Sequence, residues 1–189
     1  MNETNSTFVF LGNNPAVDFV NTEVIMRGQR VDLLPTAEDL ARWAESANLP
    51  LDLPVSQKSF TDALVLRNAL SKIFSARIDG QQGTQQVLDT INRHLLRYTT
   101  HQVLTIKENK YVLVPDNSKL KVAMLLEYLA HTGATLLTSN QAKQLKRCSN
   151  PDCILLFVDT SRSRKRRWCS METCGNRAKV SGHYQRQHS

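Results

Sequence analysis

The chain has 189 residues, of which 41% are hydrophobic and 22% charged, enough apolar material for one ordinary domain with a small appendage but not for two full domains. Seven glycines and six prolines are too few for a fibrous or low-complexity chain. Residues 154–158 form one of the longest apolar runs, and five residues are far short of the roughly 20 that a membrane span needs. The amino terminus has no signal-peptide core. We therefore expect a globular cytoplasmic protein that has no membrane segment.

Positive charge is concentrated near the carboxyl terminus. The formal net charge is +7, from 24 Lys and Arg against 17 Asp and Glu. Residues 143–189 hold eleven of these basic residues and three of the acidic ones, so this segment is +8 and residues 1–142 are −1. Such a segment has the composition of a compact nucleic-acid-binding module beside a nearly neutral body. We call residues 1–142 the body and residues 143–189 the cysteine segment, and we expect them to be two domains.

The first helices of the body are indicated by capping residues and apolar spacing. Residues 16–21 are expected to form one or two helical turns. Thr36, followed three residues later by Asp39, resembles a capping box in which Asp replaces the usual Glu. Apolar residues at helical spacing continue from Leu40 to Ala47, which predicts an amphipathic helix.

The rest of the body predicts further helices and one hairpin. Apolar stripes predict a longer helix over residues 63–78 and another over 87–95. Residues 102–106 and 111–114 are rich in β-formers and flank a polar turn, which favours a hairpin. Residues 122–137 are apolar on nearly every side, as in a buried central helix. The predicted fold is mainly α with a small β-hairpin, and the polar run 139–146 is the one candidate linker.

All four cysteines lie in the cysteine segment, at Cys148, Cys153, Cys169 and Cys174. The cysteines form two pairs, each with four residues between its members, and fifteen residues separate the pairs. Two such pairs can bind one metal ion from opposite sides. Four thiolates suit tetrahedral Zn(II) and leave no open position for a water, so the site is expected to be structural. The alternatives are two disulfides, in any of three pairings, or iron in place of zinc.

The residues between the cysteines indicate how they meet. Turn-forming residues 149–152 allow Cys148 and Cys153 to flank a tight knuckle. Residues 154–158 should form a strand. Cys169 and Cys174 are five residues apart and would point about 140° from each other on one regular helix, so Cys169 is expected just before a helix that includes Cys174. This order is similar to a treble clef, and binding of one zinc ion should be coupled to folding.

The cysteine segment resembles the CGNR zinc finger family of bacterial proteins. The resemblance is carried by Phe157 to Arg162, Arg166 to Met171 and Cys174-Gly175-Asn176-Arg177-Ala178-Lys179. The body resembles the domain that precedes this finger in the family, through Val17 to Thr22, Arg27 and Leu40 to Trp43. That domain is described as a putative stress-induced transcription regulator. The resemblance implies a helical body followed by a zinc finger in a regulator.

The cations of the cysteine segment are candidate contacts to nucleic-acid phosphates. Arg side chains can grip phosphate oxygens in pairs, and cations near the second cysteine pair would lie beside the metal. The alternative is a solvated basic loop, with Trp168 packed under the metal site. The candidate set is Arg162, Arg164, Lys165, Arg166, Arg167, Arg177 and Lys179.

A polar cluster near the amino terminus is a candidate pocket for a small-molecule effector. It consists of Asp18, Asn21, Thr22 and Arg27. The alternative is that these side chains pair with one another or with buried backbone groups.

Together these patterns predict a zinc-dependent DNA-binding protein, a transcription regulator whose helical body senses a ligand, forms a homodimer or does both. The main alternative is an RNA-binding or protein-interaction module with a structural zinc finger. A third is a small-molecule-binding body beside an unrelated finger. No phosphate loop, nucleophile elbow or metalloprotease motif is found in the sequence, so we do not expect an enzyme.

Overall fold

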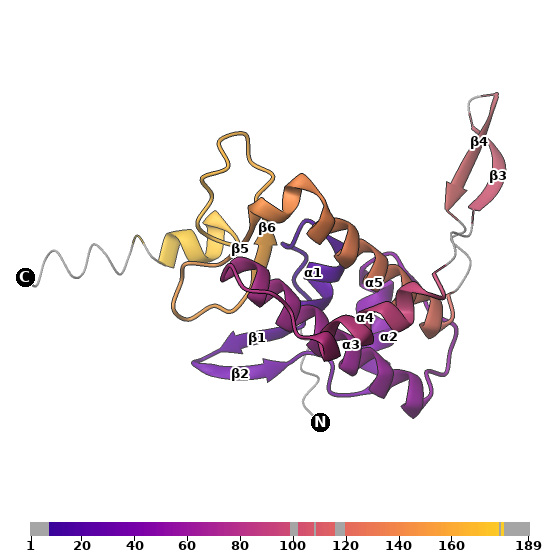
Figure 1. The fold of residues 1–189 in the computed structure, drawn as a ribbon, viewed down its shortest axis with the longest axis horizontal. Coiled ribbons are helices and arrows are strands. Elements are labelled where there is room, and N and C mark those ends of the chain that lie inside the picture. Colours follow the sequence, from indigo (N-terminus) through magenta and orange to yellow (C-terminus); the bar gives the residue numbers. More distant parts are fainter. Residues whose placement is uncertain (1–7, 99–101, 108, 116–119, 178, 180–189) are drawn as a thin grey trace, which may run out of the picture.

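The computed structural model describes residues 8–98, 102–107, 109–115, 120–177 and 179. The described part of the body contains five α-helices, and Figure 1 shows them gathered around a common core. They are α1 (Pro15–Val20), α2 (Ala37–Ser46), α3 (Gln57–Ile78), α4 (Gln85–Leu95) and α5 (Val122–Thr138). Among the described residues, no helix combines the length and apolar character that crossing a bilayer requires.

Three antiparallel two-stranded sheets complete the fold. They pair β1 (Glu23–Met26) with β2 (Gln29–Asp32), β3 (Gln102–Lys107) with β4 (Lys110–Pro115), and β5 (Leu145–Arg147) with β6 (Leu156–Val158). A 3-10 helix η1 (Asn140–Gln144) precedes β5, and one turn of π-helix η2 (Met171–Gly175) follows Cys169 and contains Cys174. The mainly helical fold with a small hairpin is confirmed.

Local capping explains where the first two helices begin. The Asn14 side chain accepts hydrogen bonds from the backbone N–H groups of Ala16 and Val17, at 2.9 and 3.3 Å. The expected capping box of α2 is present: the Thr36 Oγ1 accepts from the Asp39 N–H, and the Asp39 carboxylate accepts from the Thr36 N–H at 3.0 Å. Both helices therefore start where the sequence predicts.

Helices α3 and α5 approach closely at the centre of the core. A Cβ atom at Gly133 of α5 would lie 2.8 Å from Cδ2 of Leu70 on α3, so a larger residue cannot be accommodated there without movement. Phe19 and Trp43, on α1 and α2, are fully buried beside each other, with ring centroids 4.9 Å apart. The core therefore holds α1, α2, α3 and α5 in one packed unit, as the apolar character of α5 predicts.

Two segments differ from the sequence-based expectation. The β1–β2 hairpin was not predicted, because its strands have four residues each and half of these residues are polar. Arg27 and Gly28 form its turn with positive φ angles of 52° and 78°. The run 139–146 is not a linker, because it forms η1 and the start of β5, and Leu145 packs into the same core as the helices. Its two buried apolar residues, Ala142 and Leu145, anchor an otherwise polar stretch.

Asp18 of α1 generates a prediction on stability. Burial raises its pKa to about 6, although the backbone N–H groups of Gly12 and Leu11 oppose the rise. Because the folded protein holds this proton more tightly than the unfolded chain, the contribution of Asp18 is most favourable below pH 4 and is lost as the pH rises through 6. From pH 5.0 to 7.5 the loss is about 1 kcal/mol.

We expect the variant Asp18→Asn to lack this pH dependence. Denaturant unfolding of the two proteins at pH 5.0 and 7.5 measures it, and effects common to both, such as metal loss, cancel in the comparison. The control variant Asp52→Asn changes an exposed residue, so its unfolding free energy should depend on pH as that of the wild type does. An identical pH dependence in wild type and Asp18→Asn would contradict the assignment.

Candidate metal centre and basic loop

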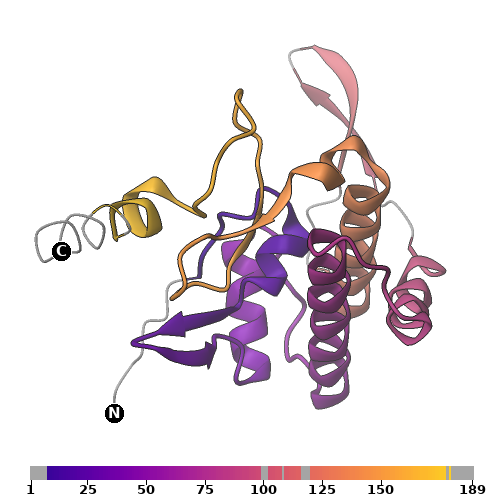
Figure 2. The ribbon, with the colours of Figure 1, turned by 60° about the vertical axis from the view of Figure 1, so that its left-hand side comes forward.

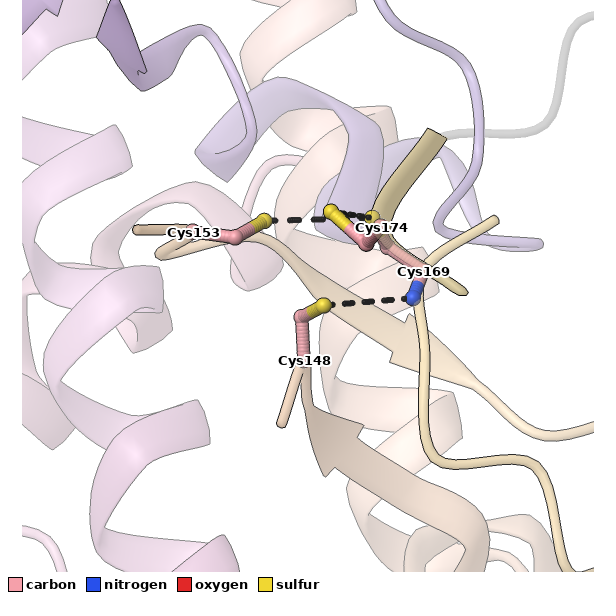
Figure 3. A group of neighbouring side chains, drawn as sticks. All are labelled: Cys148, Cys153, Cys169 and Cys174. Atoms are coloured by element: carbon pink, nitrogen blue, oxygen red, sulfur yellow. Dashed lines mark hydrogen bonds between the residues drawn. The ribbon is translucent and has the colours of Figure 1, made fainter. Parts of the chain in front are cut away.

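The four cysteines come from two short segments of backbone, 148–153 and 169–174, whose sulfur atoms meet at one point (Figure 3). Cys148 follows strand β5, and Cys153 ends a turn in which Asn150 accepts hydrogen bonds from the N–H groups of Asp152 and Cys153. Cys169 precedes η2, which begins where the Ser170 side chain accepts from the Glu172 N–H at 3.1 Å. Cys174 lies within η2, so the knuckle, returning strand and short helix are as predicted.

The separations between sulfur atoms fit a metal and exclude disulfides. All four Sγ atoms lie within 4.8 Å of one another; the Sγ atoms of Cys153 and Cys169 are 3.8 Å apart, and those of Cys169 and Cys174 are 3.5 Å apart. A disulfide needs about 2.05 Å, and all four thiols are free. Four Zn–S bonds of about 2.3 Å in a tetrahedron place the sulfurs about 3.8 Å apart. The donor set therefore fits one structural zinc ion with no open coordination position.

The crowding of sulfurs also shapes their ionisation. A hydrogen bond from the Cys169 thiol lowers the pKa of Cys153 to about 5. The same hydrogen bond, together with burial, holds the pKa of Cys169 far above its ordinary value. One thiolate forms readily, but the next ones are opposed by the charge already present. A divalent cation among the sulfurs removes that opposition, which is why metal binding and deprotonation go together.

Arg166 supports the metal centre from outside. Its Nε donates to the carbonyl oxygen of Trp168 at 2.8 Å, its Nη2 donates to the carbonyl oxygen of Cys169, and its guanidinium lies 4.4 Å from the Phe157 ring centroid. Trp168 is half-buried against the cluster of cysteines, as its packing alternative predicts. Arg166 thus joins the loop before Cys169 to the strand after Cys153.

We call residues 159–168, which connect β6 to Cys169, the basic loop. Its organising residue is Asp159, which is fully buried. The Asp159 carboxylate accepts from Lys146 Nζ at 2.7 Å, from the Ser161 N–H and hydroxyl at 3.0 and 2.6 Å, and from the Arg166 N–H at 2.8 Å. Burial opposes ionisation of Asp159, but these donors hold its pKa well below the usual range.

Lys146 and Arg164 close the loop from the other side. Lys146 Nζ also donates to the carbonyl oxygens of Arg164 and Arg166, at 2.7 and 3.3 Å. The Arg164 guanidinium returns to the carbonyl oxygen of Asp159 at 2.8 Å, and Arg164 adopts a positive φ of 54°. The loop is thus held at several points along its length. Sequence analysis did not identify Lys146 or Asp159 as loop supports, because they are 13 residues apart and lack a motif.

The predicted nucleic-acid contacts fall into two groups. Arg166 is half-buried and turned toward the metal centre. The other cations are exposed, and the loop that carries four of them extends away from the helices in Figure 2. The exposed set is Arg162, Arg164, Lys165 and Arg167 on the basic loop, and Arg177 and Lys179 after η2.

The residues predicted for a ligand pocket are used in internal contacts. Asn21 donates to the Leu156 carbonyl and accepts from the Leu156 N–H, both at 2.9 Å, which joins α1 to strand β6 of the cysteine segment. Thr22 donates to the Phe19 carbonyl, and Asp18 accepts from the Gly12 N–H at 2.7 Å. Arg27 lies apart in the exposed β1–β2 turn. The structure thus favours the alternative for the three buried residues and does not bring Arg27 to them.

A buried arginine next to this cluster was missed in the sequence. Both terminal nitrogens of Arg67 donate to the Asp32 carboxylate at 2.7 Å, and Nη1 also donates to the Thr22 hydroxyl at 2.9 Å. Arg67 lies on a predicted helix, 35 residues from Asp32, and no local pattern marks such a pair. This contact fixes the base of the β1–β2 hairpin against α3.

Metal removal is the direct test of the zinc site. Purified protein should contain one zinc ion per chain, and a strong chelator should expose all four thiols to a thiol reagent. Before chelation the same reagent should modify them far more slowly, and added zinc should restore the protection. Equal reaction rates with and without chelator, or a metal content near zero in freshly reduced protein, would contradict the site.

Asp159 provides a second test. Replacing it by Asn leaves Lys146 without a carboxylate partner, so we expect the variant Asp159→Asn to lose about 2–3 kcal/mol of unfolding free energy. Zinc should stay at one ion per chain, because the cysteines are untouched. Denaturant unfolding and metal analysis measure the two quantities, and the exposed Asp152→Asn is the matched control. Wild-type stability in Asp159→Asn would show that the loop does not depend on this residue.

Two family models match the chain in the expected order. Residues 13–140 match the family described as putative stress-induced transcription regulator, ABATE, and residues 144–187 match the CGNR zinc finger. A search of curated proteins finds no match. The first model alone spans more than half of the chain, and the second contains the four-cysteine centre described above. The chain therefore belongs to the ABATE family, with its transcription-regulator domain followed by a CGNR zinc finger.

Proposed function

We propose that this protein is a zinc-dependent DNA-binding transcription regulator of the cytoplasm. The observation that carries the proposal is the basic loop, where Arg162, Arg164, Lys165 and Arg167 are exposed on a backbone held by Asp159 and Lys146 beside the zinc site. Arg and Lys side chains arranged in this way suit the regularly spaced phosphates of a duplex. The family match, to a regulator domain and a zinc finger, supports the same function.

The net charge near the loop remains positive when the metal is counted. Four thiolates and one Zn(II) reduce the formal charge of the cysteine segment from +8 to about +6. The three acidic residues of this segment include Asp159, which is buried and paired with Lys146. Because Lys146 belongs to the same segment, this ion pair is neutral as a unit and the net charge of about +6 is carried by the other residues, which favours an anionic partner.

The rigidity of the basic loop favours affinity. A loop that is ordered before binding loses less conformational entropy when its side chains meet phosphates. In this protein the loop backbone accepts bonds from Lys146 and donates to Asp159 in the free protein. Zinc fixes the end of the same loop at Cys169, so DNA affinity should depend on the metal even though no phosphate touches it.

The role of the body is part of the proposal. We expect it to position the zinc finger and to sense a small-molecule effector or form a homodimer. One of its direct links to the finger is the pair of hydrogen bonds between Asn21 and Leu156. The matched families are regulator and zinc-finger types, which supports a non-enzymatic function. The alternative, an RNA-binding or protein-interaction module, is separated from DNA binding by the test below.

DNA affinity should fall steeply with salt. Arg166 is turned toward the metal centre and Arg164 donates to the Asp159 carbonyl, so we expect phosphate contacts from the other five predicted cations, and the slope of log K against log salt should be about −4.5, at about −0.9 per contact. Replacing Arg162, Arg164, Lys165 and Arg167 together by Gln should bring the slope near −2. Fluorescence anisotropy with a labelled duplex at several salt concentrations measures both.

The control for this experiment removes charge elsewhere. The double variant Lys58→Gln with Lys72→Gln removes two exposed lysines from α3 of the body. Its slope of log K against log salt should equal that of the wild type. A single-stranded RNA of the same sequence, added as competitor, should displace the duplex poorly. A slope near zero would overturn nucleic-acid binding, and efficient displacement by RNA would favour the RNA-binding alternative.

A further inference from the structure

The β1–β2 hairpin packs against the zinc finger through one of its faces. Val24 lies opposite Val31 in the strand register, so the two side chains share a face. Both pack in the apolar cluster that contains Cys148, Cys169 and Cys174, and Val24 is itself buried. The hairpin is therefore held directly on the metal centre, although it belongs to the body.

A buried arginine pairs with both acidic residues at the base of the hairpin. Glu23 and Asp32 lie opposite each other, and Arg67 Nη2 is 2.7 Å from Asp32 Oδ2 and 3.6 Å from Glu23 Oε1. Only 4% of the Arg67 side chain is exposed. The negative charge at the base is thus already offset within the body. The other two charged residues of the hairpin, Arg27 and Arg30, are both basic.

The outer end of the hairpin is exposed and positively charged. We call residues 26–30 the hairpin tip; all five are exposed, and Arg27 and Arg30 are its charged members. Arg30 Nη1 lies 4.0 Å from Glu23 Oε2, but 69% of the Arg30 side chain is exposed, so this ion pair is weak. The tip therefore presents two cations to solvent.

The turn of the hairpin tip holds a cation where the backbone favours a different residue. Met26 pairs with Gln29, so Arg27 and Gly28 alone form the turn, and positive φ angles of 52° and 78° are those of a type I′ turn. Such turns favour Asn-Gly, because the left-handed conformation is unfavourable for most residues other than Gly and Asn. An exposed arginine in this conformation indicates a role for its charge outside the turn itself.

The hairpin tip and the cations of the finger lie along one side of the molecule. In Figure 1 the turn between β1 and β2 points to the same side as η2, and the basic loop stands above both. Figure 2 shows the same arrangement from a second direction. Arg177 and Lys179 follow η2 in the chain, so exposed cations occur at three places on this side. A duplex that lies along the basic loop and η2 can extend to the hairpin tip.

We propose that the hairpin tip is a second contact to the DNA duplex, in which Arg27 and Arg30 bind backbone phosphates. The proposal rests on DNA binding through the basic loop, and it extends that surface from the finger to the body. Phosphate contacts fix the orientation of a protein on the duplex. The packing of Val24 and Val31 on the metal centre then sets the position of one contact relative to the other. An acidic protein is the other partner that two such cations suit, and the test below separates it.

Fluorescence anisotropy of the full zinc-loaded chain with a labelled duplex, at several salt concentrations, tests the proposal. In the double variant Arg27→Asn with Arg30→Gln, the turn has a favoured sequence but both charges are lost. The two tip contacts add about −1.8 to the slope of log K against log salt expected from the cysteine segment, so the wild type should reach about −6.3 and the double variant about −4.5. At 0.1 M salt the double variant should bind the duplex at least about tenfold more weakly.

Two control variants show whether the charge of the tip is responsible. Arg27→Lys with Arg30→Lys keeps both charges and should retain the slope of the wild type. Lys58→Gln with Lys72→Gln removes two exposed charges from α3 and should also retain it. Zinc content and circular dichroism verify that each variant is folded.

Two results would overturn the tip contact, and they differ in what else they exclude. If the double variant binds the duplex with the slope of the wild type, the tip does not contact DNA and an acidic protein is the partner to test, while the proposed function stands. If the slope of the wild type is near zero, the tip contact and the proposed function are both wrong.

Discussion

Four thiolate sulfurs cannot share one small buried volume without a cation among them, and this constraint governs the architecture of the cysteine segment. The sulfurs lie within 4.8 Å of one another, and the hydrogen bond to Cys153, burial and the charge of the neighbouring thiolates hold the pKa of Cys169 far above its ordinary value. Strand β5 ends directly before Cys148, the basic loop ends directly before Cys169, and η2 contains Cys174. The positions of the loop and its cations therefore depend on the metal.

The zinc finger and the body are built into each other. Leu145, Leu156 and Val158 of the finger strands pack into the same core as the helices. In the other direction, Val24 and Leu33 of the body pack in the cluster that surrounds the cysteines. The Asn21 side chain hydrogen-bonds both backbone groups of Leu156, as a neighbouring strand would do. The two residues are 135 positions apart in the sequence. A change at either region is thus transmitted by direct contact to the other.

The basic side chains near the metal site fall into two groups, which differ in how far burial removes them from water. One group supports the structure, and the other remains exposed to a binding partner. Lys146 and Arg166 are partly withdrawn from water, and each satisfies several carbonyl or carboxylate oxygens. Arg162 and Lys165 remain exposed on the same loop. Buried donors of this kind hold the backbone, and the exposed ones keep their charge for a partner. The basic loop therefore contains both a side chain that holds the backbone in place and side chains that form an exposed basic surface.

Local features of this protein were readable in the sequence because neighbouring residues produce them: the Thr36–Asp39 capping box, the β3–β4 hairpin, and the cysteine spacing that indicates one zinc. Contacts between distant residues were decided by tertiary packing. Asn21 and Thr22 became internal partners of Leu156 and Arg67, and the inward turn of Arg166 followed from the carbonyls around it. A pattern along the chain reports the residue type and its period, but burial and hydrogen-bond partners exist only once separated segments have packed together.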